Sequence, residues 1–280
     1  MCWLSLQLGI SLNMNSIKTA FASLYSQAKY YHLLKGAVLS EVSQRYAGSI
    51  VGLFWVVMYP VILFFIYSTL YLVVFRVKPT DMTTNMYVVY IMSGLLPFLG
   101  FSEALSVGTM SLSSKKSLLL NTVYPSEFIP LQAVLSSHIT LFVGVFLLVA
   151  ANLLFLRSLT WTVLFIPYLI VLQLMFTVGI VWVLSILNLL IKDIQQSLSF
   201  ITMLLMIMSP IAYTPTMVPS SLKLIIYLNP FSYYVLAYQD LFVRGVISQN
   251  ILIATCISIF SFIGGYLFYS KTKKVFYEFA

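Results

Sequence analysis

Residues 128–191 read FIPLQAVLSSHITLFVGVFLLVAANLLFLRSLTWTVLFIPYLIVLQLMFTVGIVWVLSILNLLI, and Arg157 is the only charged side chain among them. A charged side chain at the centre of a bilayer is costly, and roughly 20 apolar residues are enough to cross about 30 Å of hydrocarbon as a helix. The stretch is therefore long enough for two crossings, and Arg157 divides it near its middle. We predict two membrane-spanning helices, over 128–156 and 158–191, joined by a very short turn.

Four other stretches also lack Asp, Glu, Lys and Arg. They are 46–75, 82–102, 194–222 and 245–270. The 280-residue chain as a whole is 61% hydrophobic and 8% charged, whereas about 25% of the residues in a soluble globular domain are charged. This composition excludes a soluble globular protein. The sequence predicts an all-α integral membrane protein with six transmembrane helices, in a domain that covers residues 46–270.

The segment before the first span has apolar residues at helical spacing. Within residues 15–45, Leu34, Val38 and Val42 recur every four residues. This pattern predicts a cytoplasmic amphipathic helix that lies along the membrane interface. Residues 1–14 form an N-terminal extension that lacks the positively charged start of a signal peptide.

The stretch 223–244 differs from the six spans. Only 16 uncharged residues lie between Lys223 and Asp240, and the Asn-Pro pair at 229–230 interrupts them. This run is too short to span a bilayer, and nonhelical backbone at membrane depth must be buried in protein or line a watery cavity. We predict a re-entrant hairpin on the outer side between spans five and six, and a cytoplasmic tail over 271–280.

An even number of spans places both termini on the same side of the membrane. Cytoplasmic loops carry the excess of Lys and Arg, and placing the termini inside puts ten of the 15 Lys and Arg inside and five outside. We therefore expect both termini in the cytoplasm. The net charge of +8 is spread thinly along an apolar chain, so no nucleic-acid-binding surface is expected.

The chain has few residues of the kinds that build an active site. Cysteine and histidine each occur twice, and no phosphate-binding loop ending in Gly-Lys-Ser or Gly-Lys-Thr is present. One hydrogen bond to a neighbouring helix is enough to explain His138 in its apolar span, and we expect Glu103 to pair with a cation rather than carry protons. We predict no catalytic, metal-binding or cofactor-binding residues in this chain.

Aromatic residues make up 16% of the sequence and gather in the first span and in the predicted hairpin. Tyr and Trp are common at membrane interfaces in general. Their rings also present an apolar face and a polar edge, which suits contact with sugar rings. The candidate residues for lining a path are Phe54, Trp55, Tyr59, Phe64, Tyr67, Tyr213, Tyr227, Phe231, Tyr234 and Tyr238.

Several motifs occur in order along residues 30–270. They are Arg45-Tyr46-x-Gly48-Ser49-x-x-Gly52-x-x-Trp55, Gly94-Leu95-Leu96-Pro97-Phe98, Tyr124-Pro125-x-Glu127, Ser209-Pro210-Ile211 and Asn229-Pro230-Phe231. In these motifs the chain resembles the type-2 ABC permeases that export cell-surface polysaccharides such as O-antigen, capsule and teichoic acid.

The resemblance implies a permease half-unit that pairs with a second copy of itself and docks on a dimer of separate nucleotide-binding subunits. Those subunits would bind ATP and magnesium, so this chain would carry no cofactor and would not be an enzyme. The substrate would be a lipid-linked polysaccharide, moved from the cytoplasm across the bacterial inner membrane. The cytoplasmic loop 111–127 would couple to the ATPase through Lys115, Lys116, Tyr124, Pro125 and Glu127.

Lys35 and Arg45 lie where cations would meet the pyrophosphate of the lipid carrier, and we take them as candidates for that role. Two alternatives stay open. A type-2 ABC permease for a drug or another lipid shares this topology, and a membrane-embedded glycan-modifying enzyme would also be apolar and rich in aromatic residues. The aromatic content and the motif at the first span favour polysaccharide export.

Overall fold

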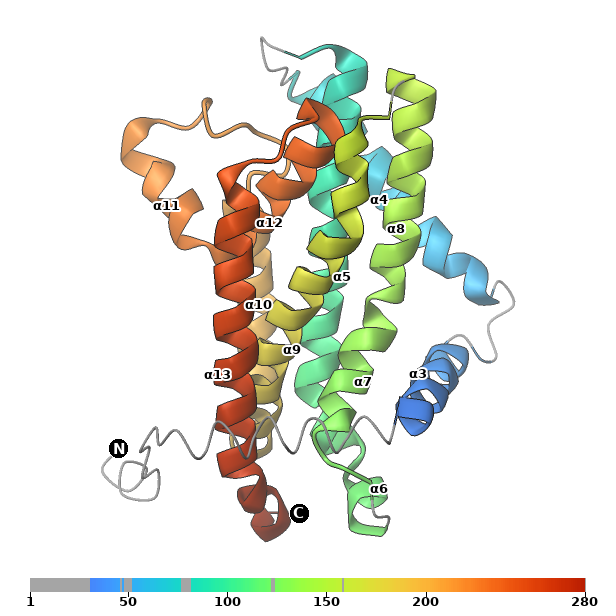
Figure 1. Cartoon of the computed structure of the whole chain (residues 1–280), viewed down its shortest axis with the longest axis vertical. Coiled ribbons are helices and arrows are strands. Elements are labelled where there is room, and N and C mark those ends of the chain that lie inside the picture. Colours follow the sequence, from blue (N-terminus) through green and yellow to red (C-terminus); the bar gives the residue numbers. More distant parts are fainter. Residues whose placement is uncertain are drawn as a thin grey trace.

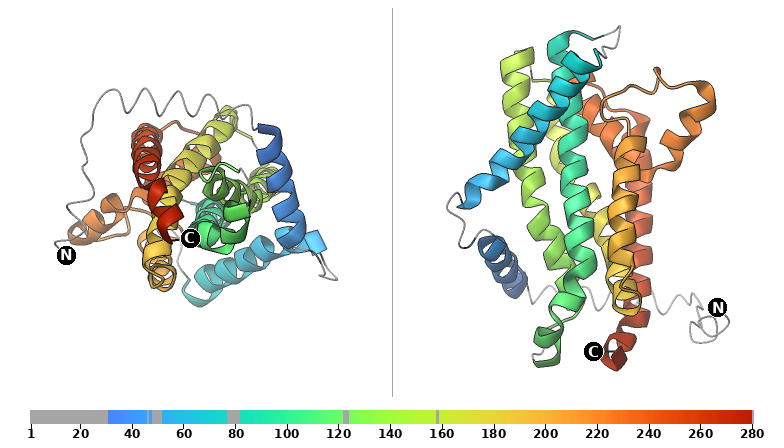
Figure 2. Two further views of the ribbon diagram at one scale, coloured as in Figure 1. Left: turned by 90° about the horizontal axis from the view of Figure 1, so that it is seen from below. Right: turned by 180° about the vertical axis from the view of Figure 1, so that it is seen from behind.

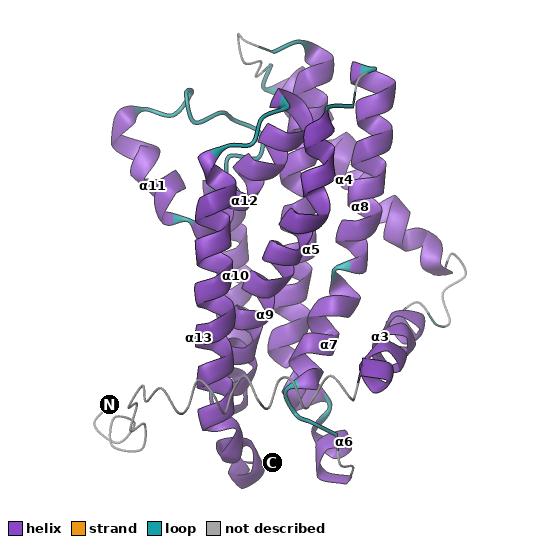
Figure 3. Cartoon of the chain, in the orientation of Figure 1, coloured by secondary structure: helices purple, strands orange, loops and turns teal. Residues whose placement is uncertain are grey.

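The computed structural model describes residues 31–45, 47, 52–76, 82–121, 124–157 and 159–279. The predicted extension 1–14 and the surface segment up to residue 30 lie outside these ranges. In the described ranges the chain forms helices and connecting turns, without strands (Figure 3). The α-helices are α3 (Tyr31–Arg45), α4 (Trp55–Thr69), α5 (Thr84–Ser114), α6 (Lys116–Asn121), α7 (Phe128–Ser137), α8 (Ile139–Ala151), α9 (Ile166–Leu190), α10 (Ile194–Met208), α11 (Lys223–Leu228), α12 (Pro230–Gln239) and α13 (Gln249–Phe279).

Five helical segments of the described chain are long and apolar enough to cross a membrane. They are Trp55–Val74, Thr84–Ser114, Phe128–Leu156, Trp161–Leu190 and Gln249–Thr272. These segments fall on five of the six predicted spans. The predicted tight turn is also present, because Arg157 has a left-handed backbone with φ of 53° between two of the segments. The all-helical membrane fold is thereby confirmed.

The predicted fifth span over 194–222 is α-helical only in its first part. Helix α10 has 15 residues and ends at Met208, which gives a length of about 22 Å against the roughly 30 Å of a hydrocarbon core. The helix stops because Pro210 has no N–H to continue the hydrogen-bond ladder. The described chain therefore has five candidate spans and one shorter apolar helix at this position.

The irregular chain that follows α10 has its backbone satisfied by side chains from other helices. Gln239 Nε2 donates to the carbonyl of Pro210 at 2.8 Å. The hydroxyl of Tyr87 donates to the carbonyl of Ala212 at 2.5 Å. Such bonds are needed where nonhelical backbone is shielded from water, since an unpaired carbonyl there is costly. They fix the path of the chain from α10 into the next helices.

Helix α5 is longer than the sequence predicted. It has 31 residues and continues to Ser114, because no proline interrupts the chain between Pro97 and Pro125. Helix α6 follows at once. Much of the segment 111–127, which the resemblance implied to be a coupling loop, is therefore helical.

Helices α5 and α9 form the centre of the bundle and α13 packs closely on α9. A Cβ atom placed on Gly179 would lie 2.2 Å from the carbonyl oxygen of Ser261, and one on Gly265 would lie 2.1 Å from the carbonyl oxygen of Gly179. Only glycine allows the two backbones to approach this closely. Small residues serve this purpose between membrane helices, whose association depends on close packing rather than on a hydrophobic driving force.

The predicted hairpin region contains two short helices, α11 and α12, which lie at the opposite end of the bundle from α6 (Figure 1). Asn229 separates them and caps α12, since its side chain accepts a bond from the N–H of Phe231 at 3.0 Å. Its amide also donates to Ser209 Oγ at 2.8 Å. Helix α12 packs inward against α5, α9 and α13.

The peripheral helices are α3, α4 and α10. Helix α3 lies across the outside of the bundle next to α7, as the view along the bundle shows (Figure 2). Leu34, Val38 and Val42 of α3 are half-buried, and the predicted position of this helix along the membrane interface stays a prediction. Helices α4 and α10 lie on either side of α5 in the rear view of Figure 2.

Candidate functional site: an open aromatic face with two cavities

Helices α4 and α10 expose large apolar side chains where they flank α5. We call this surface the α4–α10 face. From α4 and the turn before it, Phe54, Trp55, Tyr59 and Phe65 are exposed, and from α10 Phe200, Met203 and Ile207 are exposed. Large apolar side chains are also exposed elsewhere on the bundle, such as Phe146 on α8 and Phe260 on α13, as helices that meet lipid require. The α4–α10 face differs from those surfaces in the two cavities described next.

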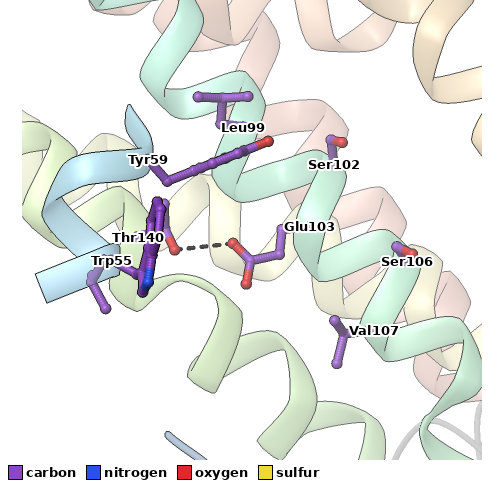
Figure 4. A pocket seen from close by; sticks show the side chains of 9 residues that line it. Trp55, Tyr59, Leu99, Ser102, Glu103, Ser106, Val107 and Thr140 are labelled. Carbon is purple, nitrogen blue, oxygen red and sulfur yellow. Dashed lines mark hydrogen bonds between the residues drawn. The ribbon is translucent and has the colours of Figure 1, made fainter. Parts of the chain in front are cut away.

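The first cavity in this face lies between α4, α5 and α8 (Figure 4). Its volume is about 460 Å³, and we call it the Glu103 cavity. Figure 4 shows Tyr59 reaching across from α4 toward α5, above the carboxylate of Glu103. The lining residues are Trp55, Val56, Tyr59, Leu99, Ser102, Glu103, Ser106, Val107 and Thr140. The cavity thus combines two aromatic side chains, three aliphatic hydroxyl groups and one carboxylate.

Glu103 is held by two neighbours. Arg45, the last residue of α3, forms an ion pair with Glu103 and donates to Ser137 Oγ at 3.3 Å. Thr140 Oγ1 donates to the other carboxylate oxygen of Glu103 at 3.0 Å. The prediction that a cation pairs with Glu103 is confirmed. This cluster joins α3, α5 and the α7–α8 segment.

A second polar cluster holds α3 one turn earlier. The carboxylate of Glu41 accepts from Lys115 Nζ at 2.5 Å, from Gln132 Nε2 at 2.6 Å and from Ser136 Oγ at 2.9 Å. Burial and the nearby Glu41 carboxylate raise the pKa of Tyr124 above its ordinary value. We call this set the Glu41 cluster. It fastens α3 to the end of α5 and to α7.

The second cavity in the α4–α10 face has a volume of about 410 Å³ and lies toward the other end of α4. Tyr67 and Tyr71 of the first span line it together with Tyr213, and we call it the Tyr67 cavity. The hydroxyl of Tyr67 reaches Met206 Sδ of α10 at 3.5 Å. Two predicted path residues from distant parts of the sequence, Tyr67 and Tyr213, therefore meet in one cavity.

The sequence of the chain matches a known protein family. The profile of the family described as "ABC-2 type transporter" matches residues 32–243, which is most of the chain. The chain belongs to the ABC-2 type transporter family. As an ABC-2 permease it is a multi-pass, non-catalytic transmembrane subunit, and permeases of this family pair with nucleotide-binding subunits that bind the ATP.

Named relatives of this ABC-2 permease share about a quarter of its residues. An "O-antigen export system permease protein RfbA" of Klebsiella pneumoniae is 28% identical over 260 residues, which cover 91% of this chain and 97% of that protein. A protein of the same name from Myxococcus xanthus is 26% identical over 216 residues, covering 76% and 81%. The chain is thus similar to these proteins over most of its length.

Three predicted path residues of the ABC-2 permease lie inside the bundle instead of on an open surface. Phe231, Tyr234 and Tyr238 of α12 are each 0% exposed. Phe231 stacks on Phe101 with ring centroids 4.2 Å apart, and Tyr234 stacks on Phe176 at 5.2 Å. These rings belong to the core, because α12 turns its aromatic side toward α5, α9 and α13. Tyr227 on α11 is exposed.

The residues implied to couple to the ATPase lie in different environments. Lys116 is exposed, whereas Lys115 is engaged by Glu41. Glu127 is buried in the turn before α7, and its backbone carbonyl accepts from Trp182 Nε1 at 3.1 Å. Pro125, in the same turn, accepts from the N–H of Phe128 at 3.0 Å. The turn is therefore built into the bundle, and Lys116 is the member that faces outward.

Of the two candidates for contacting pyrophosphate, Lys35 is exposed on α3 and Arg45 faces the bundle.

His138 is fully buried at the break between α7 and α8. Its Nδ1 contacts the carbonyl of Val134 at 2.9 Å, which belongs to the same helix and not to a neighbouring helix as expected. No group of three metal-ligating side chains occurs among the described residues.

Sequence reasoning missed the Glu41 cluster entirely. A signal was present, because Glu41 and Arg45 are four residues apart and therefore lie on one face of α3. Gln132 and Ser136 share the same spacing on α7. Two polar pairs at helical spacing, one on the predicted amphipathic helix and one in a predicted span, indicate faces that form hydrogen bonds with each other.

Proposed function

We propose that this chain is the transmembrane half-unit of an ATP-driven exporter that moves a lipid-linked cell-surface polysaccharide, O-antigen-like, from the cytoplasm across the bacterial inner membrane. The observation that carries the proposal is the α4–α10 face, with its exposed rings and two cavities. The names of the relatives point to the same substrate class. Amphipathic rings along an open face suit a polymer that slides over many weak contacts.

In this proposal two copies of the chain enclose the path between their α4–α10 faces. Seven of the ten predicted path residues remain outside the core and are retained. They are Phe54, Trp55, Tyr59, Phe64, Tyr67, Tyr213 and Tyr227. In a single copy Phe54, Trp55, Tyr59 and Tyr227 are exposed, whereas Phe64, Tyr67 and Tyr213 are half-buried. In this proposal a second copy supplies the missing wall.

The proposed topology has six crossings, with α10 and the irregular chain after it making the fifth. The short α11 and α12 helices then form the re-entrant hairpin on the outer side. Helix α3 and the end of α13 lie toward the same end of the bundle (Figure 1), which supports termini on one side. The excess of Lys and Arg at that end supports the cytoplasm as that side.

Coupling to the ATPase is proposed at the corner where α3, the end of α5 and α6 meet. The Glu41 cluster ties α3 to α5 and α7 in this corner, so a push on α6 by the ATP-binding partner is transmitted to the bundle. Lys116 offers an exposed cation for docking. ATP hydrolysis with magnesium in the partner would then rock the two permease halves.

A gene deletion tests the substrate class. We expect loss of the surface polysaccharide and accumulation of lipid-linked polymer inside the cell, measured by surface staining and by extraction of labelled glycolipid. Complementation with the intact chain should restore export. As a control, a Lys→Ala change in the partner's ATP-binding loop should reproduce the deletion. An unchanged cell surface together with increased sensitivity to a small toxic compound would instead support the drug-permease alternative.

A further inference from the structure

Helix α3 is fastened to the bundle twice, and the two fastenings differ. Glu41 receives bonds from three side chains, those of Lys115, Gln132 and Ser136. Glu103 receives bonds from Arg45 and Thr140. The Glu41 cluster therefore holds α3 without help from the second pair, and breaking the Arg45–Glu103 pair would leave α3 attached.

The surroundings of the two carboxylates differ as well. The side chain of Glu103 is 30% exposed and lines a cavity, whereas that of Glu41 is 17% exposed and lines neither of the two cavities. A ligand in the Glu103 cavity can therefore reach the carboxylate of Glu103 directly, and Arg45, which does not itself line the cavity, is paired with that carboxylate. The Arg45–Glu103 pair is therefore placed where a bound ligand could displace it.

The residues that line the Glu103 cavity include one carboxylate and no cation, so the contact for an anionic headgroup would come from Arg45, the ion-pair partner of Glu103. A guanidinium binds phosphate through paired, charge-assisted hydrogen bonds of the same kind that it forms with a carboxylate. Ser102 and Ser106 also line the cavity, but in Figure 4 they lie on the other side of α5 from the Glu103 carboxylate, and Ser106 Oγ accepts from Gln195 Nε2 of α10 at 3.1 Å. The rings of Trp55 and Tyr59 offer flat apolar surfaces for a chain or a sugar beside the phosphate.

We propose that Arg45 exchanges its partner, from the carboxylate of Glu103 to the phosphate or diphosphate of a lipid substrate that enters the Glu103 cavity. The proposal deepens the proposed function and rests on it. Glu103 acts as the internal competitor: it occupies Arg45 when the cavity is empty and excludes ligands without a strongly anionic group. On exchange, Glu103 keeps the bond from Thr140, and the Glu41 cluster keeps α3 in place.

The proposal is tested by ligand binding to the intact complex with its ATP-binding partner, reconstituted in lipid nanodiscs. Trp55 lines the cavity, so its fluorescence reports occupancy, and a Trp55→Phe variant identifies its share of the signal from the four tryptophans of the chain. The probes are farnesyl diphosphate, inorganic pyrophosphate and uncharged farnesol. We expect farnesyl diphosphate to bind most tightly, pyrophosphate more weakly, and farnesol to give no signal that depends on Arg45.

Variants of the two partners should change binding in opposite directions. Glu103→Gln removes the competitor and a repelling charge, so the Kd for farnesyl diphosphate should fall by about tenfold. Arg45→Gln removes the phosphate contact, so binding should be lost. The double variant Arg45→Gln/Glu103→Gln should behave like Arg45→Gln alone. If the pair only fastened α3, both single variants would weaken binding or leave it unchanged.

The Glu41 cluster provides the matched control. Glu41→Gln alters the other fastening of the same helix by the same chemical change, and it should leave the Kd for farnesyl diphosphate within twofold of the unmodified chain. A tighter Kd in Glu41→Gln equal to that in Glu103→Gln would overturn the proposal. So would equal, Arg45-independent binding of farnesol and farnesyl diphosphate.

The two proposals fail in different ways. If polysaccharide export is lost on gene deletion but Glu103→Gln and Arg45→Gln shift binding in the same direction, the partner exchange is wrong and the substrate class stands. If the opposite shifts are seen but deletion leaves the surface polysaccharide intact, the cavity binds anionic lipids and the glycan assignment is wrong.

Discussion

Helices α4 and α12 are both rich in aromatic residues, yet their rings lie in opposite environments. On α4, Tyr59 and Phe65 are exposed at 52% and 63%. On α12, Phe231 and Tyr234 are fully buried and stack with rings of α5 and α9. Helix α4 has neighbours on one side only, whereas α12 packs against three long helices.

The difference shows that aromatic content does not by itself indicate a surface for a substrate. The α12 rings hold the hairpin region against the bundle, and the α4 rings remain available to a second copy, a substrate or lipid. Substitutions in the two sets should therefore affect different measurements: stability for α12 and transport for α4.

The largest effect on stability is expected for Phe231→Ala. The substitution removes a ring that stacks on Phe101 at 4.2 Å and on Tyr234 at 5.5 Å, and it leaves a cavity. We expect the free energy of unfolding to fall by about 3 kcal/mol, because a large side chain is lost from a packed core. This is the low end of the range for soluble cores, since lipid is itself apolar and drives helix association less strongly than water does. Thermal unfolding of the purified permease in detergent measures the effect.

Phe65→Ala is the matched control for that substitution. It removes the same ring from a side chain that is 63% exposed on α4, so the unfolding midpoint should stay close to that of the unmodified chain. Equal losses of stability at Phe65 and Phe231 would show that α4 is covered in the folded protein, contrary to the comparison.

The sequence predicted most of the fold because the cost of a charge in the bilayer leaves long gaps between charged residues. It placed the turn at Arg157 correctly. It could not give the length of α10, because apolar residues continue after Met208 and only the proline ends the helix. Nor could it give the extent of α5, since charged residues do not end a helix.

The candidate site was predicted less well. Of the predicted path residues, Tyr59 and Tyr67 line cavities, whereas Tyr238, chosen by the same reasoning, is buried. Helix α12 carries aromatic residues on the side that faces the core, and a single sequence does not say which side that is. Contacts across long separations, such as Arg45 with Glu103, depend on packing and have no local signal.

A smaller effect separates two buried tyrosines of α12. The hydroxyl of Tyr234 contacts Ser258 Oγ at 2.5 Å and the carbonyl of Ala254 at 3.2 Å. The hydroxyl of Tyr238 is buried without a hydrogen-bond partner in the described part of the chain. Tyr234→Phe should therefore lower the free energy of unfolding by about 1 kcal/mol, and Tyr238→Phe should leave it unchanged or raise it slightly.

Both variants keep the ring, so packing is the same and the difference between them isolates the hydroxyl. Parallel thermal unfolding in one detergent gives the comparison directly. A larger loss for Tyr238→Phe than for Tyr234→Phe would mean that the hydroxyl of Tyr238 makes a contact in the membrane-bound assembly, which would assign a polar role to α12 as well as a packing role.

The smallest effect on stability, with a distinct effect on transport, is expected for Tyr59→Ala. This ring is half exposed and reaches over the Glu103 cavity (Figure 4), so its removal should change the free energy of unfolding by no more than about 0.5 kcal/mol. Polysaccharide export in the complemented deletion strain should nevertheless fall several-fold, because the polymer loses one of its stacking surfaces. Tyr59→Phe keeps that surface and should restore most of the export. If Tyr59→Ala exports at the normal rate while the protein is present in normal amount, the exposed rings of α4 face lipid rather than substrate.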